Sequence, residues 1–214
     1  MTQTEIEKLV KKQRDFFNSG ETLNVSFRIS ALERLRACII KYEKKINQAI
    51  RADLGKSAFE SYMCETGLVL SELTYMIKHT RKYAKERTVR TPLAQFHSRS
   101  YQKPSPYGVV LIMSPWNYPL MLTLEPLVDA LAAGNTAIVK PSAYSANTSD
   151  LISRMLGECF DEKYVAVVTG GREENTCLLN EHFDYIFFTG SQSVGKEVMR
   201  CASAHLTPIT LELG

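Results

Sequence analysis

Hydrophobic residues in the first ninety positions recur at intervals of three and four, the spacing of one face of an α-helix. Three such runs are present, with apolar positions at Ile6, Leu9, Val10 and Phe17; at Leu32, Leu35, Ile39, Tyr42, Ile46, Ile50 and Leu54; and at Met63, Leu73, Met76, Ile77 and Tyr83. Asn18-Ser19-Gly20 ends the first run and Gly55 ends the second. The third extends across about 59–87. We predict three helices whose apolar stripes contact a core.

The spacing changes after Gly108, where short apolar runs rich in β-branched residues alternate with helix-like segments. The runs are VVLIMS (109–114), TAIVK (136–140), YVAVVTG (164–170), YIFFTG (185–190) and PITLEL (208–213). This alternation predicts an α/β fold in which N-terminal helices are followed by a doubly wound parallel sheet. Ligands of such sheets bind beyond the carboxyl ends of the strands. We therefore expect SPWN, KPSA, VTGG, FTGS and LELG to lie on one rim.

A polar stretch separates the two halves of the chain. Thr91-Pro92 breaks the helical pattern, and HSRSYQKPSPYG favours an extended arm or hairpin. The chain is thus predicted to comprise a helical region (1–90), an arm (91–108) and an α/β domain (109–214).

Composition is typical of a soluble globular protein, with 44% hydrophobic and 23% charged residues among 214. No apolar run approaches the roughly 20 residues that cross a bilayer, and the polar start MTQTEIEKLVKKQR is unlike a secretory signal. The five cysteines show no C-x-x-C pairing, which favours reduced thiols. We predict a cytoplasmic protein with no membrane span.

The net charge of +3 conceals a difference between the halves, +9 for residues 1–103 and −6 for residues 104–214. Charges of both signs are interleaved in the basic half, as in KYEKKINQAIRADLGK, which favours solvated helix faces over nucleic-acid binding. The four histidines (His79, His97, His182 and His205) show no metal-ligand spacing. We predict neither a nucleic-acid partner nor a metal site.

The segment GSQSVGKE (190–197) has most of a P-loop, but Glu197 replaces the Ser or Thr that would touch Mg²⁺. No other predicted strand ends in the Asp that such enzymes use, and the fingerprint G-x-G-x-x-G is missing. Because the segment follows a strand and begins a helix, its backbone N–H groups can hold an anion. It is predicted to bind phosphate without metal chemistry.

Four motifs in this order resemble the aldehyde dehydrogenases, a family of NAD(P)⁺-dependent oxidoreductases. They are SPWNYP (114–119), ALAAGNTAIVKPS (130–142), FTGSQSVGK (188–196) and LELG (211–214). The resemblance runs from about residue 5 to Gly214, and YGVVLIMSPWNYPLMLTLEPL looks most like the class 3, fatty-aldehyde-like branch. It implies a Rossmann-like cofactor domain, NAD or NADP as cofactor, a small-molecule aldehyde as substrate and a homodimer for the full-length enzyme.

The resemblance also implies roles for individual residues. Asn117 matches the oxyanion-hole amide, and Glu212 matches the general base of deacylation, where partial desolvation at the end of an apolar strand would strengthen it as a base. Tyr118 and Leu122 would line the mouth of the aldehyde tunnel. The positions expected to contact the cofactor are Ser114, Trp116, Lys140, Ser142, Gly170, Gly190, Ser191, Gly195 and Leu213, with Lys140 and Ser142 at the adenosine ribose, Gly190 and Ser191 at the pyrophosphate, and Gly195 admitting its close approach.

Two departures from the family pattern change these expectations. Position 143 is Ala where many relatives have a Glu that accepts hydrogen bonds from the ribose. The family's nucleophilic cysteine lies a few tens of residues after LELG, so none of the five cysteines matches it. Cys159 and Cys201 fall in amphipathic segments and are expected to be buried. The chain is expected to be an N-terminal fragment that is inactive by itself.

Two alternatives remain. A reductase or dehydrogenase acting on acyl thioesters, acyl phosphates or semialdehydes would share the fold, but such relatives often lack the water-activating Glu, so Glu212 favours aldehyde oxidation. A non-catalytic nucleotide-binding module is the second.

Overall fold

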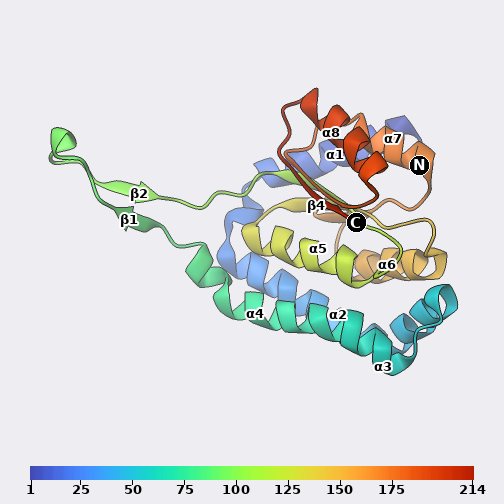
Figure 1. Cartoon of the computed structure of the whole chain (residues 1–214). Helices are drawn as coiled ribbons and strands as arrows, with labels where there is room; N and C mark the ends of the chain where they lie inside the picture. Colours follow the sequence, from blue (N-terminus) through green and yellow to red (C-terminus); the bar gives the residue numbers. More distant parts are fainter.

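In the computed structural model, which describes residues 1–214, a five-stranded parallel sheet separates two groups of helices (Figure 1). The strands are β3 (Val109–Met113), β4 (Thr136–Lys140), β5 (Val165–Val167), β6 (Tyr185–Gly190) and β7 (Ile209–Leu213). Their order across the sheet is β5-β4-β3-β6-β7. The chain adds β4 and β5 on one side of β3 and then returns to add β6 and β7 on the other. All five carboxyl ends therefore share one rim, as predicted, and the order reverses between β3 and β6.

Helices cover both faces of the sheet, and a further layer lies outside one of them (Figure 1). One face carries α1 (Gln3–Asn18), α7 (Arg172–Leu179) and α8 (Gln192–Ser203). The other carries α5 (Met121–Ala133) and α6 (Ala146–Cys159), which in turn pack against α2 (Val25–Leu54) and α4 (Gly67–Tyr83). The N-terminal helices are thus divided, because α1 packs on the sheet beside α7 while α2 and α4 form an outer layer.

Local sequence explains where the first two helices begin and end. Thr2 and Glu5 form a reciprocal capping box at the start of α1. The Asn24 side chain caps α2, and Gly55 ends it with φ of 71°, a left-handed conformation that glycine adopts without steric cost. No helix has both the length and the apolar character required to cross a membrane.

The third predicted helix, over about 59–87, is helical from Ala58 to Tyr83, but it contains a π turn and ends four residues early. A short helix, α3 (Ala58–Ser61), leads into a π-helical turn, η2 (Tyr62–Thr66), and only then into α4. The extra residue in a π turn shifts the preceding positions relative to the stripe of α4. Leu73 is buried as predicted, but Met63 is 55% exposed and Tyr83 is 39% exposed.

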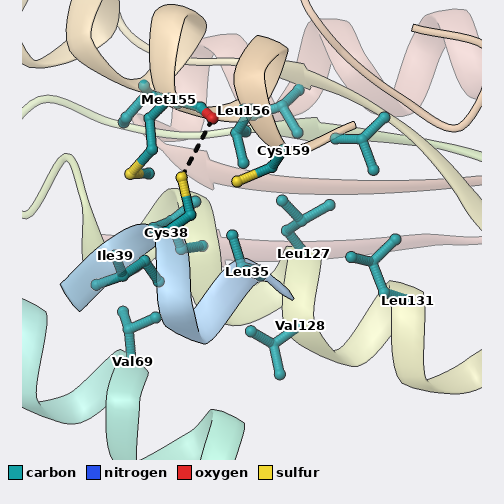
Figure 2. Close-up of a cluster of buried hydrophobic side chains, with 14 of the residues drawn as sticks. Leu35, Cys38, Ile39, Val69, Leu127, Val128, Leu131, Met155, Leu156 and Cys159 are labelled. Carbon is teal, nitrogen blue, oxygen red and sulfur yellow. Dashed lines mark hydrogen bonds between the residues drawn. The ribbon is translucent and has the colours of Figure 1, made fainter. Parts of the chain in front are cut away.

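The larger core lies between the outer helices and the sheet (Figure 2). Cys38 of α2 and Cys159 of α6 are buried in it, and the Cys38 thiol donates to the Met155 carbonyl at 3.5 Å. The burial predicted for Cys159 is confirmed. A smaller core lies between the other face of the sheet and the helices α1, α7 and α8. Cys201 of α8 is only half-buried at the edge of this smaller core, so the burial predicted for it is wrong.

A two-stranded antiparallel hairpin projects from the body of the molecule (Figure 1). It consists of β1 (Arg87–Val89) and β2 (Ser100–Gln102), with a 3₁₀ turn, η3 (Leu93–Gln95), near its tip. The extended segment therefore begins at Arg87, four residues before the start expected from Thr91-Pro92. Leu93 and Phe96 at the tip are 86% and 75% exposed.

Candidate active site

The candidate site lies on the rim where β3 and β6 end, on either side of the reversal in strand order. Ser114 to Asn117 follow β3, and Ser191 follows β6. The crevice at such a reversal is where open α/β sheets bind ligands. Lys140 at the end of β4 and Glu212 near the end of β7 complete the rim. The sheet thus brings together the strand-end residues predicted from the sequence.

Asn117 lies exposed in the loop between β3 and α5. Its Oδ1 accepts a hydrogen bond from the Tyr118 backbone N–H at 3.1 Å. Because this bond engages the side-chain oxygen, the NH₂ group of the Asn117 side chain stays available to donate to a ligand. A neutral N–H donor can stabilise a developing oxyanion without competing as a base.

Ser114 directs its hydroxyl inward rather than toward the rim. The side chain is 8% exposed, and its Oγ lies 2.5 Å from Thr123 Oγ1 on α5. The Ser114 backbone N–H donates to the Lys140 carbonyl at 3.2 Å and joins the ends of β3 and β4. Any contact of Ser114 with a ligand is therefore left to its backbone.

Lys140 is also turned away from solvent. Its side chain is 3% exposed in the structure, and its Nζ donates to the Pro141 carbonyl at 3.0 Å and the Gly170 carbonyl at 2.7 Å. Burial lowers the pKa of Lys140, while the charge of Glu174 opposes that shift. Lys140 thereby ties the end of β4 to Gly170, whose φ of +128° favours glycine. Ser142, next to this contact, accepts a hydrogen bond from the Tyr144 N–H at 3.2 Å.

The loop between β6 and α8 forms the second part of the site. Ser191 caps α8, accepting from the Val194 N–H at 3.4 Å, and the first amides of the helix point out of its N-terminus. Together with the helix dipole they favour an anion. Glu197 pairs with Arg200 at 2.6 Å on the exposed side of α8.

Two glycines flank this loop, one at the end of β6 and one in the first turn of α8, and each lies close to a side chain of the protein. A Cβ on Gly190 would lie 2.7 Å from Phe188 Cζ, and one on Gly195 would lie 2.6 Å from Leu213 Cδ2. Gly195 is buried where α8 approaches β7. A side chain at position 195 would meet Leu213, and the close approach of a pyrophosphate expected for Gly195 stays a prediction.

Glu212 lies on β7, opposite Thr189 of β6 and at the edge of the sheet. Its side chain is exposed, and so is that of Leu213. Within residues 1–214, β7 is an edge strand and no helix covers its end. The desolvation expected for Glu212 stays a prediction.

The other predicted site residues lie in the loop between β3 and α5 or in the first turn of α5. Trp116 is 53% exposed and Tyr118 is 38% exposed, so both present surface to the rim. Leu122 is half-buried and lies one turn after Tyr118. The Leu122 backbone N–H donates to the Tyr118 carbonyl at 3.0 Å. Ala143, which departs from the family pattern, is exposed beyond β4. The ligand contacts of these residues stay predictions.

Sequence reasoning missed two charged residues that reach the Asn117 loop from the N-terminal helices. The Lys56 ammonium donates to the Asn117 carbonyl at 2.9 Å and to Glu65 Oε1 at 2.7 Å. Glu65 is fully buried. One signal could have identified it: Glu65 precedes the buried residues Val69 and Leu73 at intervals of four, so a charge occupies an apolar stripe.

None of the five cysteines follows a strand on the rim, because each lies in a helix or helical turn: α2, η2, α6, α7 and α8. Burial raises the pKa of the Cys159 thiol and that of Cys201. A reactive thiolate needs the opposite, an accessible setting that lowers the pKa.

Comparison with known proteins relates the whole chain to one family. The sequence model of the aldehyde dehydrogenase family matches residues 1–214. A 4,4'-diaponeurosporen-aldehyde dehydrogenase of Staphylococcus aureus is 44% identical over 98% of the chain and 46% of its own length. Aldehyde dehydrogenase family 3 member A2 of Rattus norvegicus is 44% identical over 98% of the chain and 43% of its own length. The chain thus spans about half the length of these relatives.

Solved structures agree with this relationship. The substrate-bound state of Staphylococcus aureus AldH superposes with a TM-score of 0.96 at 44% identity, covering 98% of the chain and 46% of that structure. A betaine aldehyde dehydrogenase from the same organism, in complex with NAD⁺, gives a TM-score of 0.89 at 25% identity, covering 100% of the chain and 42% of that structure.

Proposed function

The chain belongs to the aldehyde dehydrogenase family, and from that premise we propose that it supplies the nucleotide-binding sheet and the oxyanion donor for oxidation of an aldehyde. NAD⁺ or NADP⁺ is the proposed oxidant and the carboxylic acid is the product. The observation that carries this proposal is the arrangement of two loops on one rim. The free amide end of Asn117 follows β3, and the N-terminus of α8 follows the neighbouring strand β6.

The residues present suit a dinucleotide at this rim. The N-terminus of α8 offers backbone donors for a pyrophosphate, and Gly170 and Ser142 border the end of β4 where a ribose would lie. The bound nucleotide would accept a hydride from the substrate. The buried position of Lys140 disfavours it as a counter-charge for a 2′-phosphate, whereas its contact with a ribose stays part of the proposal.

The protein's own groups act on the substrate in two stages. A cysteine thiolate adds to the aldehyde carbon, and the Asn117 amide donates to the oxygen as it gains charge. Loss of hydride then leaves a thioester. In the second stage Glu212 removes a proton from water, which attacks the thioester and releases the acid and the thiol. One aldehyde, one oxidised nucleotide and one water thus give one acid, one reduced nucleotide and one proton.

We propose that the thiolate comes from outside residues 1–214. The five cysteines present lie in helical segments, and burial raises the pKa of two of them. Residues 1–214 alone are therefore expected to bind NAD(P)⁺ weakly and to oxidise no aldehyde. The homodimer is likewise proposed for the whole protein, supported by a relative in Canis lupus familiaris named as dimeric and NADP-preferring, 42% identical over 99% of the chain.

Two assays on purified residues 1–214 test these proposals. Titration with NAD⁺ and NADP⁺ is expected to show binding, and incubation with aliphatic and aromatic aldehydes is expected to give no NADH. A longer polypeptide that includes residues 1–214 is expected to produce NADH. Turnover by residues 1–214 that one Cys→Ala substitution removes would show that the nucleophile lies in this chain after all. Failure of the longer polypeptide to oxidise aldehydes, with nucleotide binding intact, would favour the non-catalytic module.

Glu212 distinguishes aldehyde oxidation from the remaining alternative, a reductase of the same fold. An acyl or semialdehyde reductase of this fold does not need a base that activates water, and Glu212 is available on the rim for that role. Net conversion of an acyl thioester to an aldehyde, with no aldehyde oxidation in the presence of NAD(P)⁺, would favour the reductase.

A further inference from the structure

An ion pair from the N-terminal helices reaches the loop that carries Asn117. Glu65 belongs to the π turn η2, and its side chain has no exposed surface. Its Oε1 accepts from Lys56 Nζ at 2.7 Å, and the Lys56 side chain is 11% exposed. Charges this deeply buried are costly unless every group finds partners. The remaining hydrogen bonds of Glu65 and Lys56, described next, connect the pair to the Asn117 loop.

The second oxygen of Glu65 caps the helix that follows the Asn117 loop. Oε2 accepts from the backbone N–H of Leu120 at 2.8 Å and of Met121 at 3.4 Å, at the start of α5. No side chain of the loop itself caps α5. A carboxylate at this position satisfies N–H groups that have no partner inside the helix and lies favourably in the helix dipole.

Lys56 holds the other end of the same loop. Its Nζ donates to the Asn117 carbonyl at 2.9 Å and lies 4.0 Å from the centre of the Tyr118 ring, a cation–π contact. The four residues from Asn117 to Leu120 are thus bonded at their first carbonyl to Lys56 and at their last N–H to Glu65. The two side chains are joined to each other.

Glu65 lies buried within the π turn, and that turn has its own steric requirement. Its wider ring places the Tyr62 carbonyl only 2.7 Å from the position of a Cβ on residue 67, so Gly67 is needed there. π turns of this kind occur frequently at functional sites.

From these contacts we propose that Lys56 and Glu65 are positioning residues that orient the Asn117 amide for the aldehyde oxygen. The inference rests on the proposed function, because it assumes that Asn117 is the oxyanion donor. A donor of this type must be held within about 0.5 Å of its productive position, and a displacement of about 1 Å can lower a rate by ~10²-fold. The surrounding loop is exposed and short, so the buried pair supplies the restraint that its own residues lack.

A double-mutant cycle in an aldehyde-active polypeptide containing residues 1–214 tests the inference. The rate of the first burst of NADH is compared for the parent, Glu65→Gln, Asn117→Ala and the double variant. Glu65→Gln is expected to slow the burst by about tenfold or more and to leave the Kd for the nucleotide unchanged. In the Asn117→Ala background it is expected to have no further effect, because the group that it positions is gone.

The matched control is Glu162→Gln, which removes the same charge from an exposed Lys–Glu pair with Lys12, far from the rim. Its burst rate is expected to equal that of the parent. Lys56→Arg, which keeps the charge and donors, is expected to retain more of the burst rate than Lys56→Met. Equal losses in the two Lys56 variants would overturn the positioning role.

The cycle separates failure of this inference from failure of the proposed function. If Asn117→Ala leaves the burst unchanged, the oxyanion role of Asn117 is wrong. If Asn117→Ala slows the burst and Glu65→Gln lowers it by the same factor in both backgrounds, the proposed function stands and the inference is overturned.

A second measurement needs no catalysis. Amide exchange in residues 1–214 is expected to be faster at Leu120 in Glu65→Ala than in the parent, by about tenfold or more relative to Leu124 in the same helix. Unchanged protection at Leu120 would show that Glu65 does not hold the loop.

Discussion

The β3–α5 loop and the β6–α8 loop lie on the same rim but are held in different ways. The first depends on Lys56 and Glu65, which lie 61 and 55 residues earlier than the groups they bind. The second is held by its own Ser191 cap and by the contact of Gly195 with Leu213. One loop therefore takes its geometry from a distant segment and the other from nearby sequence. Changes at the first should alter chemistry, and changes at the second should alter nucleotide binding and stability.

Glu212→Gln should give the largest effect. Glu212 acts only in deacylation, so its loss should lower turnover by about 10²–10⁴-fold while the first burst of NADH remains. Stopped-flow measurement of the burst, followed by steady-state rates, checks this in an active polypeptide. Loss of the burst together with turnover would show that Glu212 acts before the thioester forms.

Asn117→Ala tests the chemistry of the β3–α5 loop directly. Removal of an oxyanion donor should cost about 2–4 kcal/mol in the step that forms the thiohemiacetal. The burst should slow accordingly, while nucleotide binding, which depends on the β6–α8 loop, should remain unchanged. A weaker Kd for NAD⁺ with an unaltered burst would reverse the roles assigned to the two loops.

Nucleotide preference should be moderate, because Ala143 places no carboxylate near the ribose. We expect NADP⁺ to be accepted at least comparably to NAD⁺ in a calorimetric titration of both. A preference for NAD⁺ above about 100-fold, equivalent to ~2.7 kcal/mol, would contradict this. Ala143→Glu should weaken NADP⁺ binding by about tenfold through repulsion of the 2′-phosphate. Ala143→Gln is the matched control without the charge.

Two glycine substitutions compare packing near the β6–α8 loop with an open position. Gly195→Ala should lower the free energy of unfolding by about 1 kcal/mol, because its Cβ would lie 2.6 Å from Leu213. Gly157→Ala in α6, where a Cβ meets no atom within 4 Å, should raise it by about 0.5–1 kcal/mol. Urea denaturation of both variants checks the difference. Equal changes in the free energy of unfolding would show that the Leu213 side chain moves aside with no loss of stability.

The smallest effect is expected at Asp129, on the helix that follows the β3–α5 loop. Burial, with Glu72 and Glu125 nearby, raises the pKa of Asp129 from 3.8 to about 6. The folded protein therefore binds its proton more tightly than the unfolded chain, so stability from this group falls as pH rises from about 4 to 6. Asp129→Asn should stabilise at pH 7 by less than about 1 kcal/mol, because the residue also has exposed surface and solvent screens the partly buried carboxylate. The gain should disappear near pH 4; an equal gain at both pH values would exclude the carboxylate as its source.

Much of the fold could be predicted from the sequence because its signals are local. Each of the five β-branched runs became a strand, and Gly55 ended α2 as its left-handed φ requires. Parallel strands place their carboxyl ends together, so the strand-end motifs with Asn117 and Ser191 were expected on one rim. These conclusions need only residue types, their spacing and the geometry of a parallel sheet.

Tertiary structure decided which side chains hold the rim in place. The sequence does not show that Lys56 and Glu65 reach Asn117 and Leu120, because those contacts depend on how the π turn η2 and the segment before α3 pack against the start of α5. It also does not show that Gly195 lies against the side chain of Leu213 on β7. Strand order within residues 1–214 puts β7 at the edge of the sheet, and Glu212 is exposed there. Periodicity specifies the inward face of an element, whereas its neighbour is fixed only when the elements pack.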